Sequence, residues 1–345
     1  MSTFEDVRAL LAEAVRSGAT PAAVLEAGRA AGAVWRTAHG RLTFDPAAPP
    51  ADDDTIFDLA SLTKVIATSS IAMQLVEARR LSLADRVARF VPAWRAADRG
   101  LVTIRDLLEH CSGLPTWRAI SLNHTGRPAF EAAIAAEPLD YTPWTRAVYS
   151  DLGFMLLGFA LEEAGGAPLE EQFTRLGLAD LCFRPDRSLQ SRTAPTREAP
   201  SRDRLLTGEV DDENAWALGG VAGHAGLFGT AAGVGAFARL VMRTLTGETP
   251  LGRPETLHRF VTRSTVPRSS RALAWDTMLP TSSCGTRMSP RSFGHTGFTG
   301  TSLWIDPGRD LYVVLLTNRV HPAYGNEALP KLRPVVHDAV VGAME

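Results

Sequence analysis

The fold of this chain is organised around residues 57–78, which read FDLASLTKVIATSSIAMQLVEA. Apolar residues at helical spacing follow Ser61 directly, which predicts that Ser61 lies at or next to the N-terminus of a helix. Residues three apart on a helix share one face, with Cβ atoms about 5–6 Å apart. We therefore expect the amine of Lys64 to reach the hydroxyl of Ser61.

Ser61 and Lys64 have the residue types of a nucleophile and its base. Serine attacks a carbonyl when a neighbour takes its proton, and a partly desolvated amine can do so, while the helix N-terminus favours a developing oxyanion. An N-cap serine beside a solvated lysine would give the same motif. Composition favours catalysis, because the chain has 36 lysines and arginines, yet Lys64 and Lys331 are its only lysines. Lysine, unlike arginine, can release its proton near neutral pH.

Composition and charge exclude several classes of protein. The chain has 345 residues, of which 45% are hydrophobic and 21% charged, as in soluble globular proteins. A net charge of −2 gives no electrostatic reason to expect nucleic acid or an anionic membrane as partner. No stretch resembles a membrane span or a signal peptide, so we expect a cytoplasmic protein. The widely spaced Cys111, Cys182 and Cys284 predict free thiols rather than disulfides or a zinc site.

The order of strand and helix patterns predicts an α/β (α+β) fold. A helical pattern over residues 4–17 precedes two or three short strands, while two buried strands follow residue 290 and a helix spans roughly 326–344. We expect one antiparallel sheet built from both chain ends and flanked by helices, with a mostly helical subdomain inserted. In numbers, one domain spans 1–345, in which 1–60 and 286–345 form the sheet subdomain and 61–285 the helical subdomain.

Two further segments carry groups capable of chemistry. Tyr149 and Asp151 lie at the head of an apolar helix, where Ser150 or Asp151 also has the residue type of a helix cap. His295-Thr296-Gly297 opens the last strand pair, where glycine allows close approach and the polar side chains can bind a substrate carboxylate or carbonyl. An irregular edge strand with a bulge is the structural alternative for this triplet.

The Gly-rich stretch 218–226 lacks the spacing of a nucleotide-binding loop. Its His224 is a candidate for the cleft, although a lone histidine is more often structural. Thr230 is expected to cap the next helix. Four nearby acids are predicted to form a solvated loop rather than a metal site, because no histidine lies at ligand spacing: Glu209, Asp211, Asp212 and Glu213.

The order Ser61-x-x-Lys64, Tyr149-x-Asp151, His295-Thr296-Gly297 resembles that of penicillin-recognising serine hydrolases. Within them the chain is similar to the branch of class C β-lactamases, D-alanyl-D-alanine carboxypeptidases and related esterases and amidases. The stretches LLEHCSGLP, AGHAGLFGT and GHTGFTGTSLWIDP also match this branch, and the resemblance covers roughly residues 20–340. It implies a β-lactamase/transpeptidase-like fold.

The resemblance also implies roles for individual residues. Ser61 would be acylated, while Lys64 and Tyr149 would share the transfer of protons. The backbone N–H groups of Ser61 and Phe298 would form the oxyanion hole. The substrate-binding residues would be Asp151, His295, Thr296, Gly297 and His224. No metal or organic cofactor is implied.

Two positions depart from the family pattern. His295 stands where many β-lactamases have lysine, so a permanent positive charge for a β-lactam carboxylate is expected to be missing. Asp151 stands where the Tyr-x-Asn pattern has asparagine, and its carboxylate would favour a charged Lys64. Both departures argue against antibiotic degradation more than against catalysis.

The substrate expectation rests on resemblance to N-acetylmuramyl-L-alanine amidases of muropeptide recycling. We therefore expect a serine hydrolase that cleaves an amide or ester in peptidoglycan-derived fragments, with a small molecule or muropeptide as its partner. Two alternatives stay open: a promiscuous carboxylesterase or weak β-lactamase, and a non-catalytic ligand-binding protein on the same scaffold. The oligomeric state does not follow from the sequence.

Overall fold

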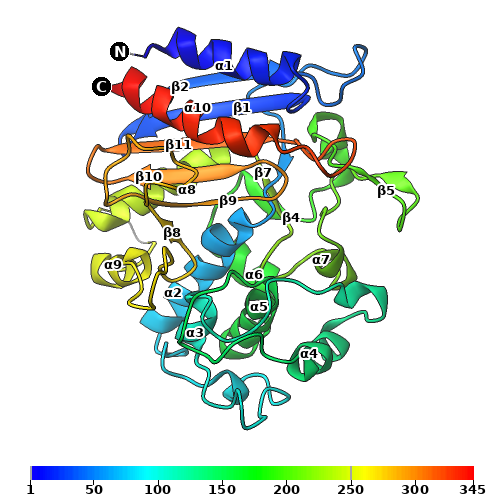
Figure 1. Ribbon diagram of the computed structural model, residues 1–345, viewed down its shortest axis with the longest axis vertical. Coiled ribbons are helices and arrows are strands. Elements are labelled where there is room, and N and C mark those ends of the chain that lie inside the picture. The colour runs from blue at the N-terminus through cyan, green and yellow to red at the C-terminus, as the bar shows by residue number, and fades with distance from the viewer. Residues whose placement is uncertain (1, 249–250) are drawn as a thin grey trace.

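The computed structural model describes residues 2–248 and 251–345. Its main sheet is antiparallel, with the strand order β2-β1-β11-β10-β9-β8 (Figure 1). The two chain ends meet in this sheet because β1 pairs with β11, which places Leu25 opposite Leu315. The sequence expectation of one antiparallel sheet from both ends is thus confirmed. The strands are β1 (Ala22–Arg29), β2 (Gly32–Gly40), β8 (Asp276–Thr277), β9 (Phe293–Thr296), β10 (Ser302–Asp306) and β11 (Leu311–Thr317).

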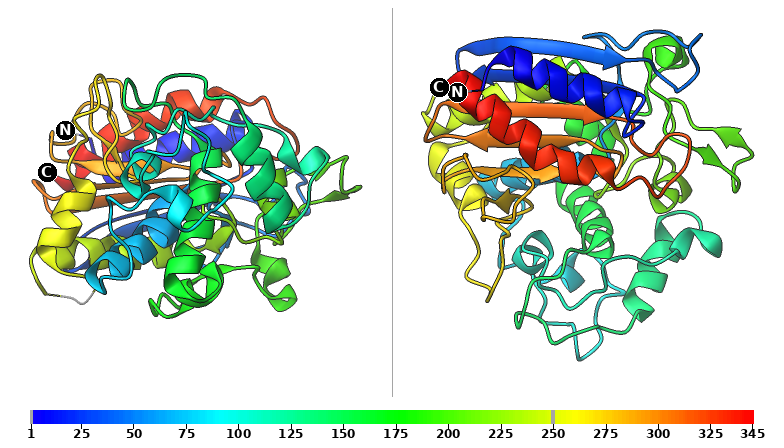
Figure 2. Two further views of the ribbon diagram at one scale, coloured as in Figure 1. Left: turned by 90° about the horizontal axis from the view of Figure 1, so that it is seen from below. Right: turned by 45° about the horizontal axis from the view of Figure 1, so that its top comes forward.

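Helices cover both faces of the sheet, as Figures 1 and 2 show. Helices α1 (Phe4–Arg16) and α10 (Ala328–Met344) lie together on one face, and α8 (Ala231–Leu245) lies on the other. Alternate residues of a strand point to opposite faces, so Leu315 packs in the core under α1 and α10 while Val314 packs in the core that contains α8. Burial on both faces explains why β11 is apolar along almost its whole length.

The rest of the chain lies beside the sheet and is mainly helical (Figure 1). Short strands are embedded in it, which the sequence patterns did not predict, and β8 and α8 come from this part of the chain but pack with the main sheet. The helices are α2 (Ser69–Glu77), α3 (Ile104–Leu108), α4 (Arg127–Ala136), α5 (Asp151–Gly165), α6 (Leu169–Thr174), α7 (Glu213–Ala217) and α9 (Pro254–Val261). The strands are β3 (Phe57–Asp58), β7 (Leu227–Gly229) and β4 (Leu181–Phe183) in one small sheet, and β5 (Glu198–Ala199) and β6 (Arg204–Leu205) in another.

Ser61 lies in the turn between β3 and a helix, as its sequence context predicts. The first full turn of that helix is a π-helix, η1 (Lys64–Thr68), which continues into α2. The N–H of Ser69 donates to the carbonyl of Lys64, five residues earlier. π-Helical turns inside helices occur frequently at functional sites.

Two sequence expectations concern cysteines and membranes. Cys111, Cys182 and Cys284 are free thiols, and Cys111 and Cys284 are buried. Within residues 2–248 and 251–345, none of the helices combines the length and apolar character needed to cross a bilayer.

Candidate active site

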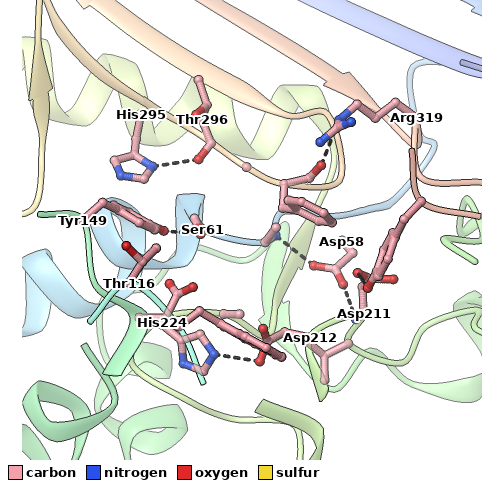
Figure 3. Close-up of a pocket in the computed structure, with 18 of the residues that line it drawn as sticks. Asp58, Ser61, Thr116, Tyr149, Asp211, Asp212, His224, His295, Thr296 and Arg319 are labelled. Atoms are coloured by element: carbon pink, nitrogen blue, oxygen red, sulfur yellow. Dashed lines mark hydrogen bonds and ion pairs between the residues drawn. The ribbon is translucent and has the colours of Figure 1, made fainter. Parts of the chain in front are cut away.

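A cavity of about 670 Å³ lies next to Ser61 (Figure 3). It forms where the turn after β3, the loop before α5 and the end of β9 meet. Lys64 is fully buried beside it and contacts Ser61. The structure thus brings together residues far apart in the sequence. The predicted residues that line the cavity are Ser61, Tyr149, Asp151, His224, His295, Thr296, Gly297 and Phe298.

The hydroxyl of Ser61 contacts both predicted proton-transfer groups. The Nζ atom of Lys64 donates to Ser61 Oγ at 3.0 Å, as expected for residues three apart. The hydroxyl of Tyr149 lies 2.7 Å from the same oxygen. Two groups that can take or return a proton therefore lie within hydrogen-bond distance of the nucleophile.

The amine of Lys64 makes three hydrogen bonds. Besides Ser61, Nζ donates to Asp151 Oδ1 at 2.6 Å and to the carbonyl oxygen of His224 at 2.9 Å. Burial alone would lower the pKa of Lys64, but the charge and hydrogen bonds of Asp151 and Tyr149 outweigh it, so the pKa of Lys64 is raised. The resting site therefore contains a charged Lys64 paired with the Asp151 carboxylate.

Tyr149 is positioned by the start of α5. Ser150 is the N-cap, as the sequence allowed: its Oγ accepts the N–H of Gly153 at 3.1 Å and donates to the carbonyl of Pro115 at 2.7 Å. The ring of His110 packs against the Tyr149 ring with centroids 4.8 Å apart. Burial, and then the negative charge of Asp151, raises the pKa of Tyr149, so the phenol is neutral.

Asp58 shapes the turn that presents Ser61. Its carboxylate accepts the N–H of Ala60 at 2.8 Å and the N–H of Asp211 at 2.7 Å. Ala60 has a φ of +47°, a left-handed conformation that non-glycine residues adopt rarely and mostly where the surroundings impose it. Burial, and then the nearby Asp211, raises the pKa of Asp58 to about 7.

The N–H groups of Ser61 and Phe298, which we call the oxyanion amides, point to no acceptor among the described residues. Buried or cavity-facing N–H groups normally have a partner, so such a pair fits an oxygen atom of a ligand. The backbone of Phe298 is held by Arg319, whose Nε donates to the Phe298 carbonyl at 3.0 Å (Figure 3).

Gly297 lets the end of β9 approach the Ser61 turn. A Cβ atom at this position would lie 2.1 Å from Thr301 Oγ1 and 2.6 Å from the carbonyl oxygen of Leu59. The hydroxyl of Thr301 in turn donates to that carbonyl at 3.0 Å. A glycine is therefore required where the strand carrying one oxyanion amide meets the turn carrying the other.

His295 is buried and neutral, and a permanent positive charge lies next to it. Arg271 Nη1 donates to His295 Nε2 at 3.2 Å, and His295 Nδ1 donates to the carbonyl of Thr296 at 2.8 Å. Burial, and then Arg271, lowers the pKa of His295 well below its ordinary value. Position 295 itself therefore carries no fixed charge, and Arg271, from a loop before β8, places one beside it.

Three of the four acids near His224 have partners within the protein, so the expectation of a solvated loop was wrong for them, while Glu209 pairs with the exposed Arg204. Asp211 is buried and accepts the hydroxyl of Tyr324 at 2.7 Å. Asp212 caps α7 and contacts His224 Nε2 at 2.7 Å, and Glu213 pairs with Arg197 at 2.5 Å. The loop folds inward because these side chains have specific partners. Asp211 and Asp212 line the cavity with His224 (Figure 3), and Glu213 lines it too.

In the described part of the chain, no group of three or more histidine, cysteine, aspartate or glutamate side chains is arranged to hold a metal ion.

A sequence model of the beta-lactamase family matches residues 7–336, which is nearly the whole chain. The chain belongs to the beta-lactamase family. Its residues Ser61, Lys64 and Tyr149 are in contact, so this family member has the geometry of a serine hydrolase. The predicted fold class is confirmed by the same match.

Comparisons with individual proteins find similar sequences and, among solved structures, a similar fold. A protein of Escherichia coli (strain K12) named as a D-alanyl-D-alanine carboxypeptidase is 34% identical over 308 residues, covering 77% of this chain and 70% of its own. The solved structure of EstCE1, described as a hydrolase with promiscuous acyltransferase activity, has a TM-score of 0.78 at 22% identity and covers 98% of both chains. A class C beta lactamase from Rhodobacter sphaeroides has a TM-score of 0.75 at 17% identity, over 98% and 99% of the two chains.

Sequence reasoning missed three groups around the cavity of this beta-lactamase family member. Arg271 and Asp58 lie at no motif spacing from Ser61, and the pairing of strands places them. Arg333 belongs to the apolar pattern of the last helix, in which a single arginine looks like an exposed residue. A signal for Asp58 was present, since an aspartate two residues before a turn commonly accepts the backbone N–H at that turn.

Proposed function

We propose that this serine hydrolase cleaves an amide bond in peptidoglycan-derived peptides through an acyl-enzyme on Ser61. The observation that carries the proposal is the position of Ser61 Oγ, 3.0 Å from Lys64 Nζ and 2.7 Å from the Tyr149 hydroxyl. The oxyanion amides lie beside it. A nucleophile, proton-transfer groups and a site for negative charge are the parts that acyl transfer requires.

The attack requires the neutral form of Lys64, because only a neutral amine can accept the serine proton. Lys64 therefore first loses a proton to solvent, while Asp151 Oδ1 stays 2.6 Å from its Nζ atom. As Ser61 Oγ bonds to the substrate carbonyl carbon, its proton moves to the Lys64 amine. The carbonyl oxygen gains the negative charge, which the oxyanion amides stabilise.

Collapse of the tetrahedral intermediate breaks the bond to the leaving amine. Tyr149 donates its proton to that nitrogen and is reprotonated by Lys64, which is 4.9 Å from the ring centroid. Water then attacks the ester on Ser61, the same groups remove its proton, and the acid product and the free serine are released. Every proton taken up in acylation is returned by the end of the cycle.

Two observations support this substrate class: the charged and polar residues of the cavity, and the names of related proteins. Arg271 and the neutral His295 border the same cavity as Ser61, where they can bind a carboxylate beside the scissile bond. Relatives at 30–34% identity carry the name D-alanyl-D-alanine carboxypeptidase. A peptide fragment of the cell wall has both the amide bond and the free carboxylate that these residues fit.

Intact-protein mass spectrometry tests the proposal. The wild type is incubated separately with a fluorophosphonate, a penicillin and a synthetic N-acetylmuramyl peptide, alongside Ser61→Ala. The exposed Ser188→Ala is the matched control. We expect an adduct or a cleaved peptide with wild type and Ser188→Ala and none with Ser61→Ala. Folded wild-type protein that gives neither adduct nor product would contradict the proposal and favour a non-catalytic binding protein.

A carboxylesterase is the second candidate, and exposed aromatic side chains favour it. Trp117, Phe298 and Tyr324 line the cavity although each is about half exposed, and such surfaces bind apolar acyl groups. A series of p-nitrophenyl esters of increasing chain length separates the two functions. An esterase would prefer the longer acyl chains, whereas a peptidase would show no such preference and would cleave the peptide amide.

A further inference from the structure

One arginine at the cavity has no partner. Arg333 is 6% exposed and lines the cavity, and its side chain makes no hydrogen bond or ion pair with any residue in the ranges 2–248 and 251–345. Its Nε atom is fully buried without an acceptor. A guanidinium has five N–H donors and stays charged, so burial without partners is costly.

Each of the other arginines of the cavity has a hydrogen-bond or ion-pair partner within the protein. Arg197 pairs with Glu213 at 2.5 Å, and Arg271 donates to His295 at 3.2 Å. Arg319 donates to the carbonyl of Phe298 at 3.0 Å and to that of Asn326 at 2.6 Å. Arg333 is therefore the arginine of this set whose side chain has no partner in the ranges 2–248 and 251–345.

The surroundings of Arg333 contain another cation but no acid that pairs with it. Burial, and then the nearby Arg319, lowers the pKa of Arg333 to about 10, so the group stays charged at neutral pH. One turn further along α10, the buried His337 is neutral, because burial and then Arg333 lower its pKa to about 3. Glu327 lies 3.9 Å from Arg319 and is exposed.

The position of this cation differs from that of the cation beside His295. In Figure 3, His295 lies to the left of Ser61, while Arg319, whose charge acts on Arg333, lies to its right. The cavity thus has positive groups in two separate places. A substrate that satisfies both needs an anionic group in addition to the carboxylate that Arg271 can bind.

We propose that Arg333 is a specificity-determining residue that binds a second carboxylate of the substrate, so the preferred substrate is an acidic peptide. The proposal rests on the proposed function and names the substrate class more closely. The planar, bidentate guanidinium matches a carboxylate. A carboxylate is favoured over a phosphate dianion because Asp58, Asp211 and Asp212 line the same cavity and repel the larger charge.

Matched thioester substrates test the proposal through thiol release. In the first pair, the D-alanine of the acyl part carries either a succinyl group, which has a free carboxylate, or a neutral acetyl group. In the second pair, the leaving group is either thioglycolate, which has a free carboxylate, or its neutral amide. The two members of each pair therefore differ by one carboxylate on one side of the scissile bond. The enzymes are wild type, Arg333→Met, Arg333→Lys and Lys331→Met. Lys331 is an exposed cation on the same helix and serves as the control.

We expect Arg333→Met to lower kcat/KM for the carboxylate member of one pair by about 10–100-fold, the effect of losing a charge-assisted hydrogen bond. The neutral member lacks the group that Arg333 binds and falls by less than about threefold. Arg333→Lys restores part of the loss, and Lys331→Met loses nothing. Equal effects on both members of each pair, or no effect on any, would overturn the proposal.

A binding measurement keeps this result separate from the proposed function. Thermal unfolding is followed in succinate, phosphate or chloride at equal ionic strength. We expect succinate to stabilise wild type and Lys331→Met but not Arg333→Met, even in the Ser61→Ala background, where no hydrolysis is possible. Equal stabilisation of wild type and Arg333→Met, or a larger effect of phosphate than of succinate, would overturn the carboxylate assignment. If the wild type cleaves no thioester but shows the succinate effect, only the proposed function fails.

Discussion

Two buried cations beside one cavity differ in what surrounds them. Lys64 is fully buried and donates to a serine hydroxyl, a carboxylate and a carbonyl. Arg333 is 6% exposed and has no such partner in the described ranges. Arg271 lies between these two cases, because its side chain has a hydrogen-bond acceptor, but that acceptor is the neutral ring of His295 and not a carboxylate.

The difference separates residues arranged for chemistry from residues arranged for a ligand. Removing one member of a buried ion pair destabilises the folded protein, because the partner charge is left buried without compensation. A buried charge without a partner destabilises the folded protein until a ligand supplies the opposite charge. The two kinds of cation should therefore respond in opposite directions when each is neutralised.

The largest effect is expected for Lys64→Met. Removing the amine takes away the base and leaves Asp151 without its ion pair. We expect kcat/KM to fall by about 10³–10⁴-fold and the free energy of unfolding to fall by about 3–5 kcal/mol. Steady-state kinetics and urea unfolding measure the two losses, with Lys331→Met as the control. A variant that keeps both activity and stability would show that the pair of Lys64 and Asp151 is needed for neither.

Arg271→Met tests the intermediate case. Without this cation, the pKa of His295 rises because one of the three causes that lower it is gone, while burial and the charge of Lys64 continue to lower it. We expect kcat/KM for carboxylate-bearing substrates to fall by about 10-fold. NMR titration follows the His295 ring, and His337, which lies next to Arg333, should not move. An unchanged His295 titration would mean that Arg271 does not act on it.

Asp151→Asn sharpens the assignment of Lys64. Activity requires the neutral amine, so it rises as the pH passes upward through the pKa of Lys64. The carboxylate raises that pKa, and its loss leaves burial to lower it. The acid limb of the profile of kcat/KM against pH should therefore move to lower pH, by about 1–3 pH units. If the acid limb of the variant lies at the same pH as that of the wild type, the limb belongs to a group other than Lys64.

The smallest effect, and the one of opposite sign, is expected for Arg333→Met in the absence of ligand. Methionine keeps most of the apolar stem and removes an unpaired charge. We expect the free energy of unfolding to rise by about 1 kcal/mol, measured by urea unfolding against Lys331→Met. A fall similar to that of Lys64→Met would show that Arg333 is held by contacts that stabilise the fold.

Contacts between residues close in sequence could be predicted, and contacts made by strand pairing could not. The reach from Lys64 to Ser61 follows from helix geometry, and the cap at Ser150 follows from its residue type. The antiparallel sheet from both chain ends follows from the positions of the apolar strands. Arg271 reaches His295 because β8 pairs with β9, and no local spacing encodes that pairing.

Burial of charged residues was the second limit. Asp211 looked like part of a solvated loop because four acids lie close together in the sequence. Its partners, Tyr324 and Arg197, come from other parts of the chain. A charged residue is assigned to the surface unless its partner is known, and partners distant in sequence become known only with the fold.

The oxyanion amides belong to two different segments, one before η1 and the other after β9. They are held in register by the approach at Gly297 and by the hydroxyls of Thr299 and Thr301, which donate to the backbone of residues 58 and 59. A small slip along this seam would separate the amides while every helix and strand stays intact. Catalytic activity therefore depends on the alignment of these two segments. Mild denaturant should abolish activity before circular dichroism detects any loss of secondary structure.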